Sequence, residues 1–362
     1  MGAFTAASEI CASNDAMQVD NPVWAFTLES VALGFHGIQD YNRADAFFRE
    51  ATRAFVTCYG EKSMPVVNVK KLLSDTLEAK QDLEGVIDIQ QEIINLLEQD
   101  DFVDFKFELV MAQYASGRAH FQKERFDAAT LMAERARSQL SKLDQSLSNV
   151  QFYIARCEEL LGHVQTATGD KEAATDSYKA ALQSFHRALG DKEFQKYPSV
   201  AYMLTSLGTL ELGRGNVDKS LTLLTQAHQM MIKYPHPAQG SIEMLLHALG
   251  SALMHDKQFE AAIEVFLGIV AKSEDSVLQA TSLLYITQAN MLQSKCHETL
   301  ESLEVTVDYF LEQEDKGQLA SMFEDKLTEC LAAVHGKFSS NFTDADKSIF
   351  KRIVDKVAKL KN

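Results

Sequence analysis

The feature that most constrains the fold is a spacing of small and bulky residues within residues 158–182. Gly162, Ala174 and Ala181 are small, whereas Tyr178 is bulky. Two short antiparallel helices that pack face to face need small residues where their backbones come close and a bulky residue to fill the gap beside them. Such a pair leaves apolar surface uncovered, so it must stack on neighbouring pairs of the same kind.

The same spacing recurs along the chain. Glycines that follow leucine stand at Gly162, Gly208 and Gly250, in nearly equal steps. The other units, in chain order, fall at 35–51, 73–93, 117–136 and 286–307. The second unit of the chain keeps the apolar residues without the small ones, and the seventh is weak. About seven helix pairs are therefore predicted between residues 21 and 312.

This spacing resembles the tetratricopeptide repeat. With Gly162 at position 8 of the repeat, Ala174 falls at position 20, Tyr178 at position 24 and Ala181 at position 27. The resemblance implies an all-α fold: a right-handed superhelix of helix-turn-helix repeats, which is an α-solenoid, with C-terminal capping helices. Units of about 42 residues, longer than the minimal repeat, resemble those of the kinesin light chain subgroup. So do the exits Cys58-Tyr59-Gly60 and Ala188-Leu189-Gly190, each followed by a proline and a valine.

The two ends of the chain lack the repeat spacing. Residues 1–20 are small and polar, so we expect a disordered leader there. The array is predicted to run from 21 to 312, beginning with Pro22 in the first turn of a helix. Residues 313–362 then form a capping segment.

Two helices are expected in the capping segment. The first covers residues 316–335 and is closed by Gly336. The second covers 344–360, with Thr343 as its N-cap. This last helix is basic and amphipathic. Three roles stay open for residues 343–361: capping the final repeat, docking on a partner, or contact with an acidic membrane surface.

Composition narrows the class of partner. The formal net charge is −16, and no basic stripe is visible. Nucleic acid is therefore not the expected partner, because phosphate contacts need clustered Lys and Arg. A basic protein partner suits the charge. The five cysteines are scattered, and no apolar run is long enough to span a membrane, so we expect a cytoplasmic protein without a transmembrane segment.

Motifs for enzyme chemistry are missing from the sequence. There is no GxxxxGK[ST] loop, no GxSxG elbow and no HExxH pair. Gly213-Arg214-Gly215 fits the turn between two repeat helices. His247 and His255 could share a helix face, but no third ligand has a matching spacing. We therefore expect no catalytic activity, no cofactor and no metal.

The resemblance also implies a binding face. In tetratricopeptide proteins, positions 2, 5, 9 and 12 of each first helix line the concave side. Here those positions are rich in Tyr, Arg and Met, which are enriched in the cores of protein interfaces. The candidate partner-binding residues are Met111, Tyr114, Arg118, Phe121, Arg156, Glu159, Tyr202, Met244 and His247. The alternative is that second helices or the cap bury them.

The functional hypothesis is a non-enzymatic adaptor or scaffold. It would bind a partner peptide or helix in its concave groove, as a subunit of a larger assembly. Glu29 and Leu33 occupy positions where chaperone cofactors have Lys and Asn, so a carboxylate clamp is not expected. The alternative is a peptide-responsive or phosphatase-type helical-repeat regulator of a signalling protein. A purely structural role in a cytoskeletal or organellar complex would share the architecture.

Overall fold

The computed structural model describes residues 21–99, 105–235, 239–312 and 316–360. These residues form α-helices and one short 3₁₀ helix, and no strand occurs among them. The predicted leader at 1–20 lies outside the described residues. The chain divides into two compact units, unit 1 (Met1–Asp191) and unit 2 (Lys192–Asn362).

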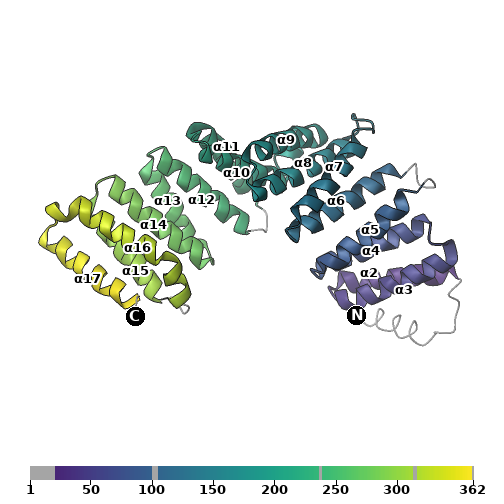
Figure 1. Cartoon of the computed structure of the whole chain (residues 1–362), viewed down its shortest axis with the longest axis horizontal. Coiled ribbons are helices and arrows are strands. Elements are labelled where there is room, and N and C mark those ends of the chain that lie inside the picture. Colours follow the sequence, from purple (N-terminus) through teal and green to yellow (C-terminus); the bar gives the residue numbers. More distant parts are fainter. Residues whose placement is uncertain (1–20, 100–104, 236–238, 313–315, 361–362) are drawn as a thin grey trace. The chain divides into compact units, whose positions relative to one another are not determined.

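Unit 1 is built from helices that follow one another in stacked pairs (Figure 1). In chain order they are α2 (Pro22–Gly37), α3 (Tyr41–Tyr59), α4 (Met64–Ala79), α5 (Leu83–Leu97), α6 (Lys106–Gln122), α7 (Phe126–Leu140), α8 (Ser148–Thr168) and α9 (Lys171–Phe194). The first helices of the four pairs begin at Pro22, Met64, Lys106 and Ser148, in equal steps that match the predicted repeat length.

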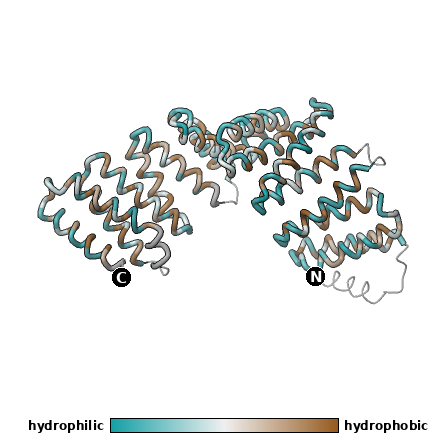
Figure 2. The backbone as a smooth tube through the Cα atoms, in the orientation of Figure 1, coloured by the Kyte–Doolittle hydropathy of each residue, from teal (hydrophilic) through white to brown (hydrophobic). Residues whose placement is uncertain are grey.

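Unit 2 continues the same alternation. Its helices are α10 (Pro198–Gly213), α11 (Val217–Lys233), α12 (Gln239–His255), α13 (Phe259–Lys272), α14 (Ser276–Leu292), α15 (Cys296–Glu312), α16 (Lys316–Phe338), the 3₁₀ helix η2 (Ser339–Asn341) and α17 (Asp344–Leu360). Figure 2 shows hydrophobic and hydrophilic residues interleaved along the helices, as expected where each helix buries one face. The seven predicted pairs are therefore all present, from α2–α3 to α14–α15.

The small and bulky positions of the repeat meet as predicted. A Cβ atom added to Gly162 would lie 2.7 Å from the ring of Tyr178, and one added to Gly250 would lie 2.6 Å from the ring of Phe266. Both rings are fully buried. The glycines therefore let each first helix approach its second helix closely. The register places the other pairs of positions 8 and 24 at Ala32–Phe48, Ser74–Gln90, Gly117–Ala133, Gly208–Leu224 and Thr287–Leu303.

The second repeat forms a helix pair like the others, α4 and α5, although Val86 and Ile93 stand at positions 20 and 27 in place of small residues. Ser74 occupies position 8, and its Oγ accepts a hydrogen bond of 2.8 Å from Nε2 of Gln90 at position 24. Both side chains are buried. A hydrogen-bonded polar pair thus replaces the glycine and aromatic ring found in the fourth and sixth repeats, and this exchange hides the repeat from a search for small and bulky residues.

The turn inside each of the seven pairs uses one residue with positive φ. These residues are Gln39, Gln81, Glu124, Gly169, Gly215, Lys257 and Ser294. Only two of them are glycine, although the left-handed region costs other residues roughly 1–2 kcal/mol. Gly60, which follows α3, and Gly190, a non-helical residue that kinks α9, share a second conformation, with φ of 80° and 67° and ψ of 158° and 167°. That region is essentially restricted to glycine.

The capping segment differs from the prediction at one point. Gly336 does not end its helix, because α16 continues to Phe338 before η2 begins. The added residues bring Phe338, which is 5% exposed, into the apolar cluster that also contains Val334. Burial of one more aromatic ring therefore outweighs the weak helix propensity of glycine.

Helix α17 begins with the predicted cap. The Thr343 hydroxyl accepts a hydrogen bond of 3.2 Å from the backbone N–H of Asp346, and the backbone N–H of Thr343 donates to the Asp346 carboxylate at 3.0 Å. The helix then packs on α15 through Ile353 and Val357, which are buried.

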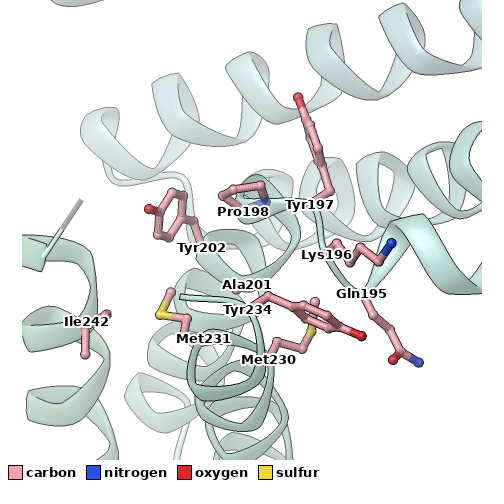
Figure 3. A pocket seen from close by; sticks show the side chains of 10 residues that line it. All are labelled: Gln195, Lys196, Tyr197, Pro198, Ala201, Tyr202, Met230, Met231, Tyr234 and Ile242. Atoms are coloured by element: carbon pink, nitrogen blue, oxygen red, sulfur yellow. The ribbon is translucent and has the colours of Figure 1, made fainter. Parts of the chain in front are cut away.

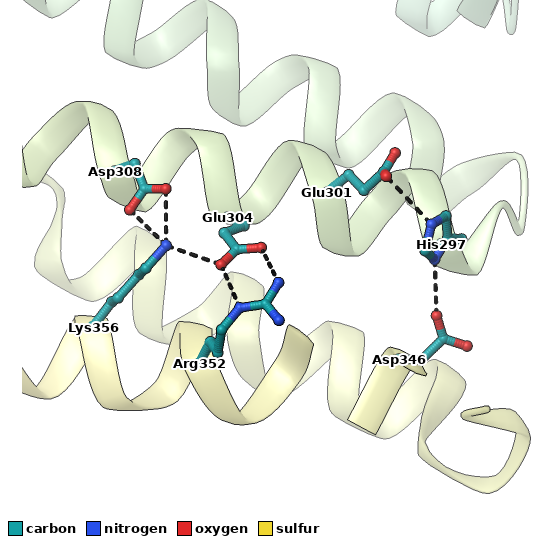
Figure 4. A network of polar contacts seen from close by, with 7 residues as sticks. All are labelled: His297, Glu301, Glu304, Asp308, Asp346, Arg352 and Lys356. Carbon is teal, nitrogen blue, oxygen red and sulfur yellow. Dashed lines mark hydrogen bonds and ion pairs between the residues drawn. The ribbon is translucent and has the colours of Figure 1, made fainter. Parts of the chain in front are cut away.

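Ion pairs flank this apolar contact (Figure 4). Glu304 of α15 accepts from Arg352 at 2.8 Å and from Lys356 at 2.9 Å, and Lys356 also pairs with Asp308. The hydrogen bond from Arg352, opposed by burial and aided by Lys356, lowers the pKa of Glu304 to about 2. At least two basic residues of α17 are thus engaged by α15.

Candidate interaction surface

Five of the nine candidate residues line one hollow in unit 1. The hollow has a volume of about 210 Å³ and lies between the first helices α6 and α8. It is lined by Tyr114, Arg118, Phe121 and Gln122 of α6 and by Arg156, Glu159, Leu160 and His163 of α8. The two helices come from consecutive repeats. The lining residues share a hollow because equivalent positions of stacked first helices face the same side.

Ion pairs hold the two arginines of this hollow. Nη2 of Arg118 lies 2.6 Å from Oε1 of Glu78, which belongs to α4 of the preceding repeat. Nη1 of Arg156 lies 2.6 Å from Oε2 of Glu159, one turn further along α8. The Arg156 guanidinium also lies 5.3 Å from the ring centre of Tyr114, within the range of a cation–π contact. Both guanidinium groups are therefore positioned before any ligand arrives.

The floor of the hollow is connected to the repeat core. The hydroxyl of Tyr178 lies 2.9 Å from Nδ1 of His163 and 3.2 Å from the hydroxyl of Thr166. The residue that fills position 24 thus also supports a side chain of the hollow. Burial raises the pKa of Tyr114, against the opposing charge of Arg156, so its phenol stays protonated.

The remaining candidates are not gathered with these five. Met111 lies on α6 before Tyr114, is partly buried and does not line the hollow. Tyr202 lines a separate, tight hollow of about 20 Å³ in unit 2 (Figure 3). Met244 is 70% exposed on α12. The ring of His247 packs against Phe266 and Tyr285 instead, at centroid distances of 6.0 and 5.5 Å, and burial lowers its pKa.

The small hollow around Tyr202 is mostly apolar and aromatic. Its lining comes from α10, α11, the segment before α10 and one residue of α12. The lining residues are Gln195, Lys196, Tyr197, Pro198, Ala201, Tyr202, Met230, Met231, Tyr234 and Ile242. Figure 3 shows Met230 beside Tyr234, and Met231 on the side of Tyr202 and Ile242. The hollow is too small to admit a peptide side chain without rearrangement.

A larger hollow, which the sequence did not predict, lies in unit 2. It has a volume of about 340 Å³ between α14 and α16. Its lining residues are Thr281, Leu284, Tyr285, Gln288 and Met291 of α14 and Lys326, Glu329, Cys330 and Ala333 of α16. With Thr287 at position 8, positions 2, 5, 9 and 12 of α14 all belong to this lining. Extending the concave register to the seventh repeat would have found them.

Two further searches of the described residues bear on chemistry. Within them, no group of three or more His, Cys, Asp or Glu side chains is arranged to hold a metal ion. Nor does any helix in that part of the chain have both the length and the apolar character needed to cross a membrane.

Comparison with known proteins relates this arrangement to repeat proteins. No protein family and no curated protein matches the sequence. Among solved structures, the apo form of RapI aligns with 86% of this chain and 99% of its own, at a TM-score of 0.51 and 12% identity. YrrB, described as a TPR protein with an unusual peptide-binding site, covers 67% of this chain and 97% of its own, at a TM-score of 0.40 and 15% identity.

A tetratricopeptide repeat protein from Parabacteroides merdae ATCC 43184 also matches. It covers 86% of this chain and 98% of its own, at a TM-score of 0.47 and 11% identity. The chain has the fold of tetratricopeptide repeat proteins, an all-α solenoid of helix pairs. The closer likeness to the kinesin light chain subgroup stays a prediction.

Proposed function

We propose that this protein is a non-enzymatic interaction scaffold that takes a peptide or helix of a partner protein in the hollow between α6 and α8. The observation that carries the proposal is the convergence of five candidate residues, chosen by repeat position, on one hollow of about 210 Å³. A scaffold of this kind acts as one subunit of a larger assembly.

The lining suits a polypeptide ligand. Phe121 is partly exposed and offers an apolar surface, while Arg118 and Arg156 offer donors in a fixed fork geometry. Arg, Tyr and other aromatic side chains dominate the energetics of protein interfaces. Because the ion pairs with Glu78 and Glu159 already order the arginines, less side-chain entropy is lost on binding. The net charge of −16 favours a partner that is basic overall, since complementary charge speeds encounter.

The proposal places the protein in the cytoplasm. Cys157, Cys296 and Cys330 are free thiols, which persist in a reducing compartment. Burial raises the pKa of Cys157 to about 12 and that of Cys330 to about 11, so neither thiol is a ready nucleophile.

Affinity purification from native extract, read by mass spectrometry, tests the proposal. Arg118→Glu places a second acid beside Glu78, and we expect it to lose the partners that the wild-type chain retains. Arg125→Glu is the matched control, because Arg125 also pairs with a glutamate, Glu84, but lies outside the hollow. Tyr114→Ala removes a ring of the lining and should act like Arg118→Glu.

A further variant separates the two hollows. Tyr202→Ala alters only the small hollow of unit 2, so we expect it to keep the partners that Arg118→Glu loses. Retention of every partner by Arg118→Glu and Tyr114→Ala, with circular dichroism spectra unchanged, would show that the hollow between α6 and α8 is not the binding face.

A further inference from the structure

A second hollow of unit 1 lies among α3, α4 and α5 and has a different chemistry. Its volume is about 310 Å³. The lining residues are Arg49, Thr52 and Arg53 of α3, Lys70 and Leu73 of α4, and Ile89 and Glu92 of α5. Three cations and one carboxylate thus face one space, so its lining carries a net charge of +2.

The lysine of this hollow is buried. Lys70 is only 8% exposed, and its Nζ lies 2.6 Å from Oε2 of Glu92. The Glu92 side chain is 53% exposed, so water screens the charge that it offers. A buried ammonium group is costly unless it is well paired. Because the carboxylate of Glu92 is half exposed, it neutralises the charge of Lys70 only in part, and a second anion can bind beside Lys70.

The two arginines sit one turn apart on α3, where like charges repel. Nε of Arg49 donates to Asp45 at 2.6 Å, and Nε of Arg53 donates to the backbone oxygen of Arg49 at 3.4 Å. In the described part of the chain, the terminal amino groups of Arg49 and Arg53 make no hydrogen bond. Asp45 is shared, because it also accepts from Lys80 at 2.7 Å. The cations of the hollow therefore outnumber the carboxylates available to them.

The location of this cluster is unusual for the chain. Residues 1–110 contain 19 acidic and 8 basic side chains, so this is its most acidic stretch. Three cations that converge on one hollow run against that trend, and solubility does not require them. Guanidinium and ammonium groups in such an arrangement match the oxygens of a phosphate group, which takes several charge-assisted hydrogen bonds.

We propose that the hollow among α3, α4 and α5 binds a phosphate monoester, carried by a phosphorylated serine or threonine of a partner protein. Arg49 and Arg53 donate through their terminal amino groups, and Lys70 supplies the buried charge. The site is separate from the hollow between α6 and α8 and does not depend on that function. It would let phosphorylation of the partner decide whether this protein binds it.

Isothermal titration of the full-length chain tests this site. The probe is an acetylated Gly-Gly-phosphoserine-Gly-Gly peptide, compared with its unphosphorylated twin and with inorganic phosphate at constant ionic strength. We expect binding of the phosphopeptide and none of the twin. Arg53→Glu should weaken binding at least tenfold. Arg135→Glu, an equal charge change at an exposed arginine of α7 outside the hollow, should leave it within about twofold.

A gain-of-binding variant gives an independent arm. Glu92→Gln removes the internal competitor for Lys70, so the phosphopeptide should bind at least threefold more tightly. Absence of phosphopeptide binding, or equal weakening by Arg53→Glu and Arg135→Glu, would overturn the site. Tighter binding of inorganic phosphate than of the phosphopeptide would overturn the partner protein as the source of the phosphate.

Discussion

The hollow between α6 and α8 in unit 1 and the hollow between α14 and α16 in unit 2 form in the same way but differ in chemistry. The first lies between the first helices of the third and fourth repeats. The second lies between the first helix of the seventh repeat and α16 of the capping segment. Each is lined by residues at the concave positions of the repeat. The first contains two arginines held by glutamates. The second contains no arginine; one lysine and one glutamate, Lys326 and Glu329, lie there beside apolar side chains such as Leu284.

The buried rings that support the two hollows also differ. In unit 1, Tyr178 fills position 24 and also contacts His163 through its hydroxyl. In unit 2, Phe266 fills position 24 and stacks on Tyr285 at 4.9 Å, with an angle of 3° between the rings. The repeat frame thus determines where a hollow lies, while a few residues at variable positions decide which charged and aromatic groups line it.

Removal of either supporting ring should have the largest effect. Tyr178→Ala and Phe266→Ala each delete a fully buried ring, so each should cost about 3–5 kcal/mol in the free energy of unfolding. Urea unfolding followed by circular dichroism measures both. If one of the two variants unfolds with a nearly unchanged free energy, the two rings do not have equivalent roles in their repeats.

Filling the space beside these rings should cost less. Gly162→Ala and Gly250→Ala each force a Cβ atom against a ring at 2.7 and 2.6 Å, and about 1–3 kcal/mol of overpacking should result. Gly268→Ala is the control, because nothing lies within 4 Å of its added Cβ on α13. There the better helix propensity of alanine should stabilise by about 1 kcal/mol. The opposite signs separate close packing from a general effect of alanine.

A single hydroxyl distinguishes the two supports. Tyr178→Phe keeps the ring but loses the contacts with His163 and Thr166, so we expect a loss of about 1 kcal/mol. Tyr285→Phe in unit 2 is the counterpart. Among the described residues its hydroxyl makes no hydrogen bond, so its unfolding free energy should not change. Equal losses in both variants would show that the hydroxyl of Tyr178 contributes no more to stability than that of Tyr285.

An ion pair of a histidine, His297, with Asp346 holds the end of unit 2, so its stability should depend on pH near neutrality. The hydrogen bond to Asp346, together with Glu301, raises the pKa of His297. Its stabilisation is therefore present below the unfolded pKa of about 6.5 and is lost as pH rises through the folded pKa. The same hydrogen bond lowers the pKa of Asp346, which stays ionised across this range.

The thermal midpoint of His297→Gln checks this prediction. The variant should fall below the wild type at about pH 5.5 and approach it at about pH 8.5. Arg118→Gln is the counterpart in unit 1, and its deficit should be the same at both values, because its ion pair with Glu78 contains no histidine. A pH-independent deficit in His297→Gln would show that the ion pair does not hold α17.

Much of this architecture could be predicted from the sequence, because close helix packing demands small residues at fixed offsets. Gly162, Gly208 and Gly250 identified three repeats. Positions counted from Gly117 and Gly162 selected Tyr114, Arg118 and Arg156, which line one hollow. The predictions concerning site and partner remain to be tested by binding.

Other features could not be predicted, for physical reasons. A hydrogen bond joins Ser74 and Gln90, so positions 8 and 24 of the second repeat show neither glycine nor an aromatic residue. Glu78, the partner of Arg118, lies on that same repeat and was missed with it. Thr287 stands where glycine was expected in the seventh repeat, which concealed the register of α14 and its hollow.

Site-specific photocrosslinking is the most direct test of the central claim, that the hollow between α6 and α8 binds the partner. A benzoylphenylalanine at Phe121 places the reactive group in the hollow, and one at Leu131, which is exposed on α7, serves as the control. We predict that a peptide of the partner is crosslinked to position 121 and not to position 131. Crosslinking at 131 alone would contradict the assignment.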